Sequence, residues 1–148
     1  MLSYRFRVYP SKVTALNLVR QLELCRWLYN RLLEELNKAR ESGQKLAMID
    51  TQSLITRLKC EEPELRIVHS KPLQMVNYQL WCNLKALGRL KERGRRVGKL
   101  RFKKSFRTMN FNQTGFSIDK NRGKLKLSKI GEIPIKLHRV VRGKVKAV

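Results

Sequence analysis

The spacing of the apolar residues differs between the segments of this chain, and the difference limits the folds open to it. From residue 13 to residue 40 apolar side chains recur every three or four positions, which is the period of an α-helix. The same spacing returns at about residues 50–61 and 70–87. Beyond residue 100 the spacing falls to two, the period of a β-strand. These periods predict an α+β fold in which the helices precede most of the strands. The apolar seam of the first helix comprises Leu18, Leu22, Cys25, Tyr29, Leu32, Leu36 and Ala39.

Short alternating segments, separated by glycines, predict a small antiparallel β-barrel or half-barrel. They lie at residues 100–103, 108–112, 116–118, 124–127, 133–137 and 144–148. Residues 4–9 also alternate, and a lone first strand needs partners, so it is expected to pair with the late strands. The helical block is then an insertion. The predicted division is residues 1–11 for the first strand, 12–95 for a bundle of about three helices, and 96–148 for the rest of the barrel.

Composition narrows the class of protein further. The chain has 148 residues, enough for one domain, and contains no apolar run long enough to span a membrane. Its N-terminus has no apolar signal core, so a cytoplasmic protein is expected. Three widely spaced cysteines argue against a disulfide framework. His69 and His138 are isolated, so no metal site is expected.

Positive charge is abundant and unevenly distributed. The formal net charge is +23. Residues 89–148 hold 20 Lys and Arg against 3 Asp and Glu, and residues 1–88 hold 14 against 8. Such an excess is typical of proteins that bind polyanions, with nucleic acid favoured over a membrane surface.

The strongest candidate binding site is the basic segment around Gly94 and Gly98, since Lys and Arg form charge-assisted hydrogen bonds with phosphates. A solvated run that confers only solubility is the alternative. The candidate phosphate-binding residues are Lys85, Arg93, Arg95, Arg96, Lys99, Arg101, Lys103, Lys104 and Arg107.

Two groups of amides could read bases. Gln74, Asn77, Trp81 and Lys85 share a second face of the third predicted helix, where Gln and Asn could bond base edges. An ordinary polar face with Trp81 in the core is the alternative, and for Trp81 the core is favoured. The second group is Asn110, Asn112 and Gln113, for which a strand edge with turn residues is the alternative.

Catalysis has little support in the sequence. Two-metal nucleases need several carboxylates that converge on ions about 4 Å apart. The only aspartates are Asp50 and Asp119, and most glutamates fall on predicted helix surfaces. No catalytic residue is assigned.

Several segments, in order, resemble the N-terminal part of TnpB/OrfB, the transposon-encoded RNA-guided DNA endonucleases related to type V CRISPR effectors. They include Gln74 after Ser70 and Leu73, the pair His138–Arg139, and residues 143–146. The longer matching segments are 4–10 (YRFRVYP), 25–30 (CRWLYN), 100–104 (LRFKK), 109–113 (MNFNQ) and 123–131 (GKLKLSKIG).

The resemblance implies a β-barrel wedge domain with an inserted helical recognition domain. It further implies binding of a guide RNA scaffold and of a short DNA motif beside the transposon, with Gln74 on a helix that faces that motif. The family's RuvC-like nuclease domain and zinc ribbon lie beyond the part resembled. No cofactor is therefore expected here, and Mg²⁺ and Zn²⁺ would belong to the nuclease half. Ser128 departs from the family's usual proline.

Three functions remain open at this stage. The first is a nucleic-acid-binding module of a TnpB-like protein that binds RNA and duplex DNA without cutting. The second is a recognition subunit, or a truncated relic, that works with a separately encoded nuclease half. The third is a repurposed DNA-binding repressor with no RNA partner. No small-molecule ligand or membrane partner is expected.

Overall fold

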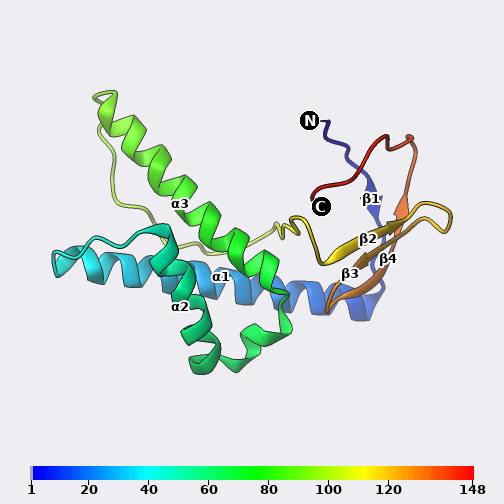
Figure 1. Ribbon diagram of the computed structural model, residues 1–148, viewed down its shortest axis with the longest axis horizontal. Helices are drawn as coiled ribbons and strands as arrows, with labels where there is room; N and C mark the ends of the chain where they lie inside the picture. The colour runs from blue at the N-terminus through cyan, green and yellow to red at the C-terminus, as the bar shows by residue number, and fades with distance from the viewer. Residues whose placement is uncertain (1) are drawn as a thin grey trace.

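The computed structural model describes residues 2–148 and has the predicted α+β composition. Residue 1 of the predicted first segment lies outside them. Three α-helices and one short 3-10 helix precede most of a four-stranded antiparallel sheet, as Figure 1 shows. The elements are β1 (Arg7–Val8), α1 (Lys12–Glu41), α2 (Met48–Glu61), η1 (Pro63–Ile67), α3 (Ser70–Glu92), β2 (Phe116–Asp119), β3 (Lys124–Leu127) and β4 (Gly131–Lys136).

The first predicted helix is present, and much of its apolar seam is buried. It begins after Ser11, whose Oγ accepts the Thr14 N–H at 3.3 Å and so satisfies one of the free donors of the first turn. It ends before Gly43, whose φ of +76° is in the left-handed region, where a residue without a Cβ is favoured. Cys25 and Leu32 are fully buried along the seam. The predicted span of 13–40 therefore differs from α1 by one residue at each end.

The other two helices begin at their first predicted residue or just before it. The predicted segment 50–61 is α2, which begins at Met48, and the Asp50 carboxylate in its first turn accepts the Ala47 N–H at 2.7 Å. The predicted segment 70–87 is α3, which begins at Ser70 and is capped by His69, whose Nδ1 accepts the Lys71 N–H at 3.2 Å.

The sheet has the strand order β1-β4-β3-β2. Val8 pairs with Ile135, so the first strand joins the late strands as predicted, with the helices inserted between them. Leu125 pairs with Ile133 across β3 and β4. Within the described residues β1 and β2 are the two edges, so the sheet is open and the predicted barrel is not confirmed.

One predicted strand is absent and two are reduced to a short contact. Residues 100–103 form no strand, and both backbone groups of Lys103 bond to the Asn30 side chain of α1. Residues 108–112 and 144–148 pair through one bridge, between Asn112 and Ala147, and through backbone hydrogen bonds between Phe111 and Val148. At the N-terminus only Arg7–Val8 of the predicted 4–9 is strand. These segments lack a continuous partner, and a strand requires one.

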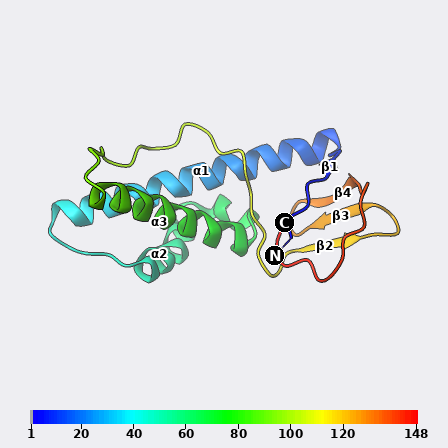
Figure 2. The same ribbon diagram turned by 90° about the horizontal axis from the view of Figure 1, so that it is seen from above.

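Two apolar cores hold the molecule together. One lies among α1, α2, η1 and α3, and the other lies beneath the sheet around Phe111, Leu125 and Ile133. Met109 packs against both cores, and Leu18 of α1 packs against the second. The sheet therefore sits at the N-terminal end of α1 (Figures 1 and 2). The connector, residues 93–115, leaves the far end of α3 and crosses α1 to reach the sheet (Figure 2).

Candidate nucleic-acid interface

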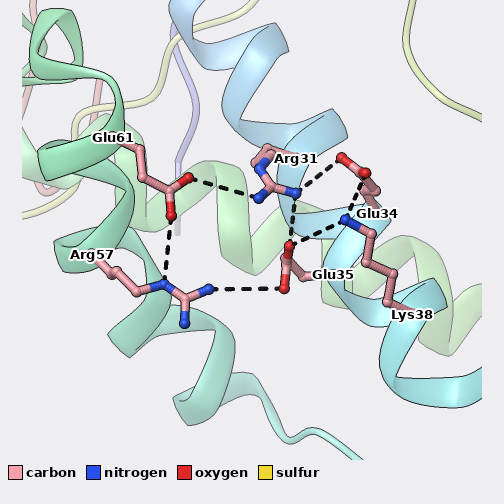
Figure 3. Close-up of polar contacts among 6 residues, drawn as sticks. All are labelled: Arg31, Glu34, Glu35, Lys38, Arg57 and Glu61. Atoms are coloured by element: carbon pink, nitrogen blue, oxygen red, sulfur yellow. Dashed lines mark hydrogen bonds and ion pairs between the residues drawn. The ribbon is translucent and has the colours of Figure 1, made fainter. Parts of the chain in front are cut away.

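Three glutamates of the helical bundle, Glu34, Glu35 and Glu61, are paired on the face that α1 and α2 share. Arg31 Nη1 lies 2.7 Å from Glu35 Oε1 and 3.0 Å from Glu34 Oε2. Arg57 joins Glu35 and Glu61 from α2, at 3.9 Å and 3.7 Å. Cations and anions are equal in number in this network, so the face carries no net charge. Figure 3 shows its members, which are Arg31, Glu34, Glu35, Lys38, Arg57 and Glu61.

The end of α3 and the basic connector that follows it have no such pairing. Among the described residues, no Lys or Arg between positions 85 and 107 takes part in an ion pair. All of these cations except Lys103 are exposed. Unpaired exposed cations repel one another, and a polyanion relieves that repulsion. The exposed predicted site residues are Lys85, Arg93, Arg95, Arg96, Lys99, Arg101, Lys104 and Arg107.

Lys103 is the point at which the connector is fixed to α1. The Asn30 Nδ2 donates to the Lys103 carbonyl at 2.9 Å, and the Lys103 N–H donates to Asn30 Oδ1 at 2.8 Å. The Lys103 ammonium lies 4.8 Å from the Tyr29 ring centroid and 4.7 Å from that of Phe106. Lys103 thus packs against aromatic rings, whereas a free phosphate-binding position was expected.

The outer face of α3 keeps part of the predicted base-reading set. Gln74 and Lys85 are exposed on it. Tyr78 lies one turn beyond Gln74 and is 53% exposed, which adds an aromatic ring to this face. Sequence reasoning missed Tyr78, although its spacing of four from Gln74 was a usable signal.

Asn77 does not belong to that face, and its prediction is corrected here. The residue is 1% exposed. Its Nδ2 donates to the Met48 carbonyl and to Gln52 Oε1, each at 3.1 Å, and its Oδ1 lies 2.8 Å from Thr51 Oγ1. Trp81 Nε1 also donates to Thr51 Oγ1, at 2.8 Å. Both side chains therefore join α3 to α2, because a buried amide or indole N–H requires partners inside the protein.

The amide-rich segment lies beside the start of α3. Lys71 Nζ is 3.4 Å from Gln113 Oε1, across 42 residues of sequence. Asn110 and Gln113 are exposed and Asn112 is half-buried. The fold thus brings Gln113 to the end of α3 that carries Gln74, which the sequence did not predict.

The same junction is electropositive. His69 is half-buried there, and burial, followed by the charges of Lys129 and Lys71, lowers the pKa of its imidazole. Lys129 Nζ donates to the Arg66 carbonyl at 2.5 Å. A phosphate near this junction would meet cations from both α3 and the sheet.

Within residues 2–148 no three His, Cys, Asp or Glu side chains are grouped so as to hold a metal ion. No described helix combines the length and the apolar character needed to cross a bilayer.

An open sheet joined to a helical bundle, with unpaired cations gathered on one connector, has the electrostatics of a polyanion-binding protein. Residues 1–45 match the family model HTH_OrfB_IS605, described as a helix-turn-helix domain. The match confirms the resemblance to TnpB/OrfB transposases for this N-terminal part, and it indicates DNA binding by a transposon protein. No curated protein matches the chain.

In the part of the match that the structure describes, residues 2–45, there is one helix. These residues hold β1 and all of α1, which runs unbroken for 30 residues, whereas a helix-turn-helix needs a second helix after a short turn. The exposed side chains of the first half of α1 include Val13, Leu16 and Val19, which are 78%, 65% and 63% exposed. Apolar side chains fit a phosphate-lined groove poorly.

Proposed function

We propose that this chain is the nucleic-acid-binding module of a TnpB-like transposon protein. It binds a structured guide RNA through the connector and contacts duplex DNA beside the transposon through α3 and the Asn/Gln segment. The proposed activity is binding, without cleavage, at the nucleoid. The observation that carries the proposal is the contrast between the paired face of α1 and α2 and the unpaired cations of residues 85–107.

The connector suits a phosphate backbone for two reasons. Its cations are exposed and free of carboxylate partners within the described residues, so a phosphate does not have to break an existing ion pair. Its backbone is held at Lys103 by the Asn30 side chain, which reduces the conformational entropy lost on binding. Arg95 and Arg101 can each bind a phosphate with two parallel hydrogen bonds.

The α3 face suits DNA. Gln74 is exposed, so its amide can form two hydrogen bonds with an adenine edge. Gln113 lies at the same end of α3 through its contact with Lys71. Lys85 follows three turns along the helix and can meet a phosphate. These side chains combine a base contact with backbone contacts, as groove readers do.

A salt titration tests the electrostatic part. Replacing Arg95, Arg96 and Lys99 by Gln should lower the slope of log affinity against log salt by about 2 to 3, because each phosphate contact contributes about 0.7 to 0.9. The control replaces three other exposed cations by Gln, namely Lys12, Arg40 and Lys45. It removes the same charge, and its slope should stay within about 0.5 of that of the unmodified protein. Equal slopes for the two variants would refute the connector as the interface.

A repurposed DNA-binding repressor is the second candidate, because the family match indicates DNA binding and carries no statement about RNA. Purification from cells, followed by sequencing of protected RNA, separates the two. A defined RNA that copurifies supports the guide-RNA module. Duplex binding with no copurifying RNA supports the repressor. A separately encoded nuclease half that copurifies would instead identify the chain as a recognition subunit.

A further inference from the structure

One exposed aromatic side chain of the connector packs against neither apolar core. Phe102 is 56% exposed, and it is absent from the hydrophobic residues that pack against either core. Its neighbours Arg101 and Lys104 are also exposed. A single exposed apolar residue is ordinary on a protein surface. A phenyl ring that lies between unpaired cations, on a backbone held by hydrogen bonds, is unusual.

The backbone around Phe102 is held in place at short intervals. Leu100 and Phe106 both pack against the helical core. Between them the Asn30 side chain bonds both backbone groups of Lys103, and the Lys103 ammonium faces the rings of Tyr29 and Phe106. Phe102 is therefore presented to solvent from a segment with little freedom to turn its ring inward.

We propose that Phe102 is a stacking site for an unpaired nucleobase of a single-stranded polynucleotide, with Arg101 and Lys104 bound to the flanking phosphates. The inference rests on the proposed function and adds the strandedness of the ligand. Aromatic rings interleaved with cations bind single strands, because every base has a π-face and every nucleotide a phosphate. Duplex DNA covers the faces of its bases and offers no partner to the ring. An apolar protein partner would have to bury the unpaired cations beside it.

The test compares strands of about 20 nucleotides with and without bases. Fluorescein-labelled oligo(dU) is titrated with the full chain, with Phe102→Ala and with Phe102→Trp. Phe102→Ala should weaken binding about 5- to 150-fold, and Phe102→Trp should restore it, because indole also stacks. On an abasic deoxyribose-phosphate strand, Phe102→Ala and the unmodified protein should bind equally. Val140→Ala, which removes another exposed apolar side chain, should leave every affinity unchanged.

Equal affinity of Phe102→Ala and the unmodified protein for oligo(dU) would overturn the stacking site. An equal loss on the abasic strand would overturn it too, since the loss would then come from the backbone contacts. In those cases the variant in which Gln replaces Arg95, Arg96 and Lys99 remains informative. If it still has a lower slope of log affinity against log salt than the unmodified protein, the proposed function stands. If the unmodified protein binds no polynucleotide, both fall. Oligo(U) in place of oligo(dU) distinguishes an RNA ligand from a DNA ligand by the tighter of the two affinities.

Discussion

Asn30 on α1 holds both backbone groups of Lys103, a residue 73 positions further along the chain, through hydrogen bonds of 2.9 Å and 2.8 Å. The Asn30 amide thus bonds the Lys103 backbone as a neighbouring strand would. It satisfies buried backbone groups and sets the course of the connector over α1. The exposed cations on either side of Lys103 depend on it for their position.

Replacing Asn30 by Ala should lower the free energy of unfolding by about 1–3 kcal/mol, because the Lys103 N–H and carbonyl lose their partner. Urea denaturation measures the change. Asn37→Ala is the matched control, since Asn37 is half-buried on the same helix and its side chain has no hydrogen bond to a described residue. The control should be neutral or slightly stabilising, given the helix propensity of Ala. Similar losses for both variants would show that the bonds to Lys103 contribute nothing.

Gly115→Ala should destabilise the junction between α3 and the sheet by about 1–3 kcal/mol. Gly115 has a φ of +88°, and a Cβ there would lie 2.8 Å from His69 Cε1 and 3.0 Å from Phe111 Cδ1. Gly88→Ala is the control, because no atom lies within 4 Å of its added Cβ, and it should stabilise α3 by about 0.5–1 kcal/mol. Thermal melting of both variants checks the opposite signs. A stabilising Gly115→Ala would contradict this geometry.

The His69 imidazole should make stability fall in mild acid. Burial and the charges of Lys129 and Lys71 hold its pKa below the ordinary 6.5, so the folded protein favours the neutral ring. The unfolded chain then binds the proton more readily, and the contribution of His69 is present above pH 6.5 and lost as the pH falls through the lowered pKa. His69→Asn keeps a helix-capping side chain without this titration. Urea midpoints of the two proteins should diverge between neutral pH and about pH 5, and parallel curves would argue against the shift.

Alanine variants of Asn77 and Gln74 should separate an effect on folding stability from an effect on DNA binding. Asn77→Ala should lower the free energy of unfolding by about 1–3 kcal/mol, because it strips partners from Thr51 and Met48 inside the protein. Its affinity for duplex DNA should not change under conditions where the protein is fully folded. Gln74→Ala should do the reverse, with stability within about 0.5 kcal/mol of the unmodified protein and weaker DNA binding. Gel-shift titration and urea denaturation of both variants measure the two effects.

Local periodicity predicted the helices well. The predicted seam contains four of the eight buried side chains of α1, namely Cys25, Tyr29, Leu32 and Ala39, because a helix that faces a core repeats its apolar residues every three or four positions whatever its neighbour is. The strand at β3 was predicted with its observed bounds, Lys124–Leu127, because it alternates between two glycine turns. Residues 100–103 alternate as well, yet the backbone of Lys103 bonds to Asn30, and no alternation within the segment could reveal a partner on a distant helix.

The candidate interface was predicted in part for the same reason. Charge is a property of the residue type, so the basic connector was visible in the sequence, and the family match to residues 1–45 agrees with the motif near the first strand. Whether a side chain is accessible is a property of its neighbours. Asn77 and Gln74 looked equivalent on one helix, and only the packing of α2 buries the first and leaves the second exposed.

The sequence by itself determined three things: the presence and order of the three long helices, the gradient of positive charge, and the pairing of the first strand with the late ones. The tertiary structure alone decided that the sheet stays open and that Lys103 turns inward. It also decided which cations remain unpaired and that Phe102 faces solvent. Periodicity and charge are local and can be read residue by residue. Closure, burial and ion pairing depend on contacts such as Asn30 with Lys103, between positions that only the folded chain brings together.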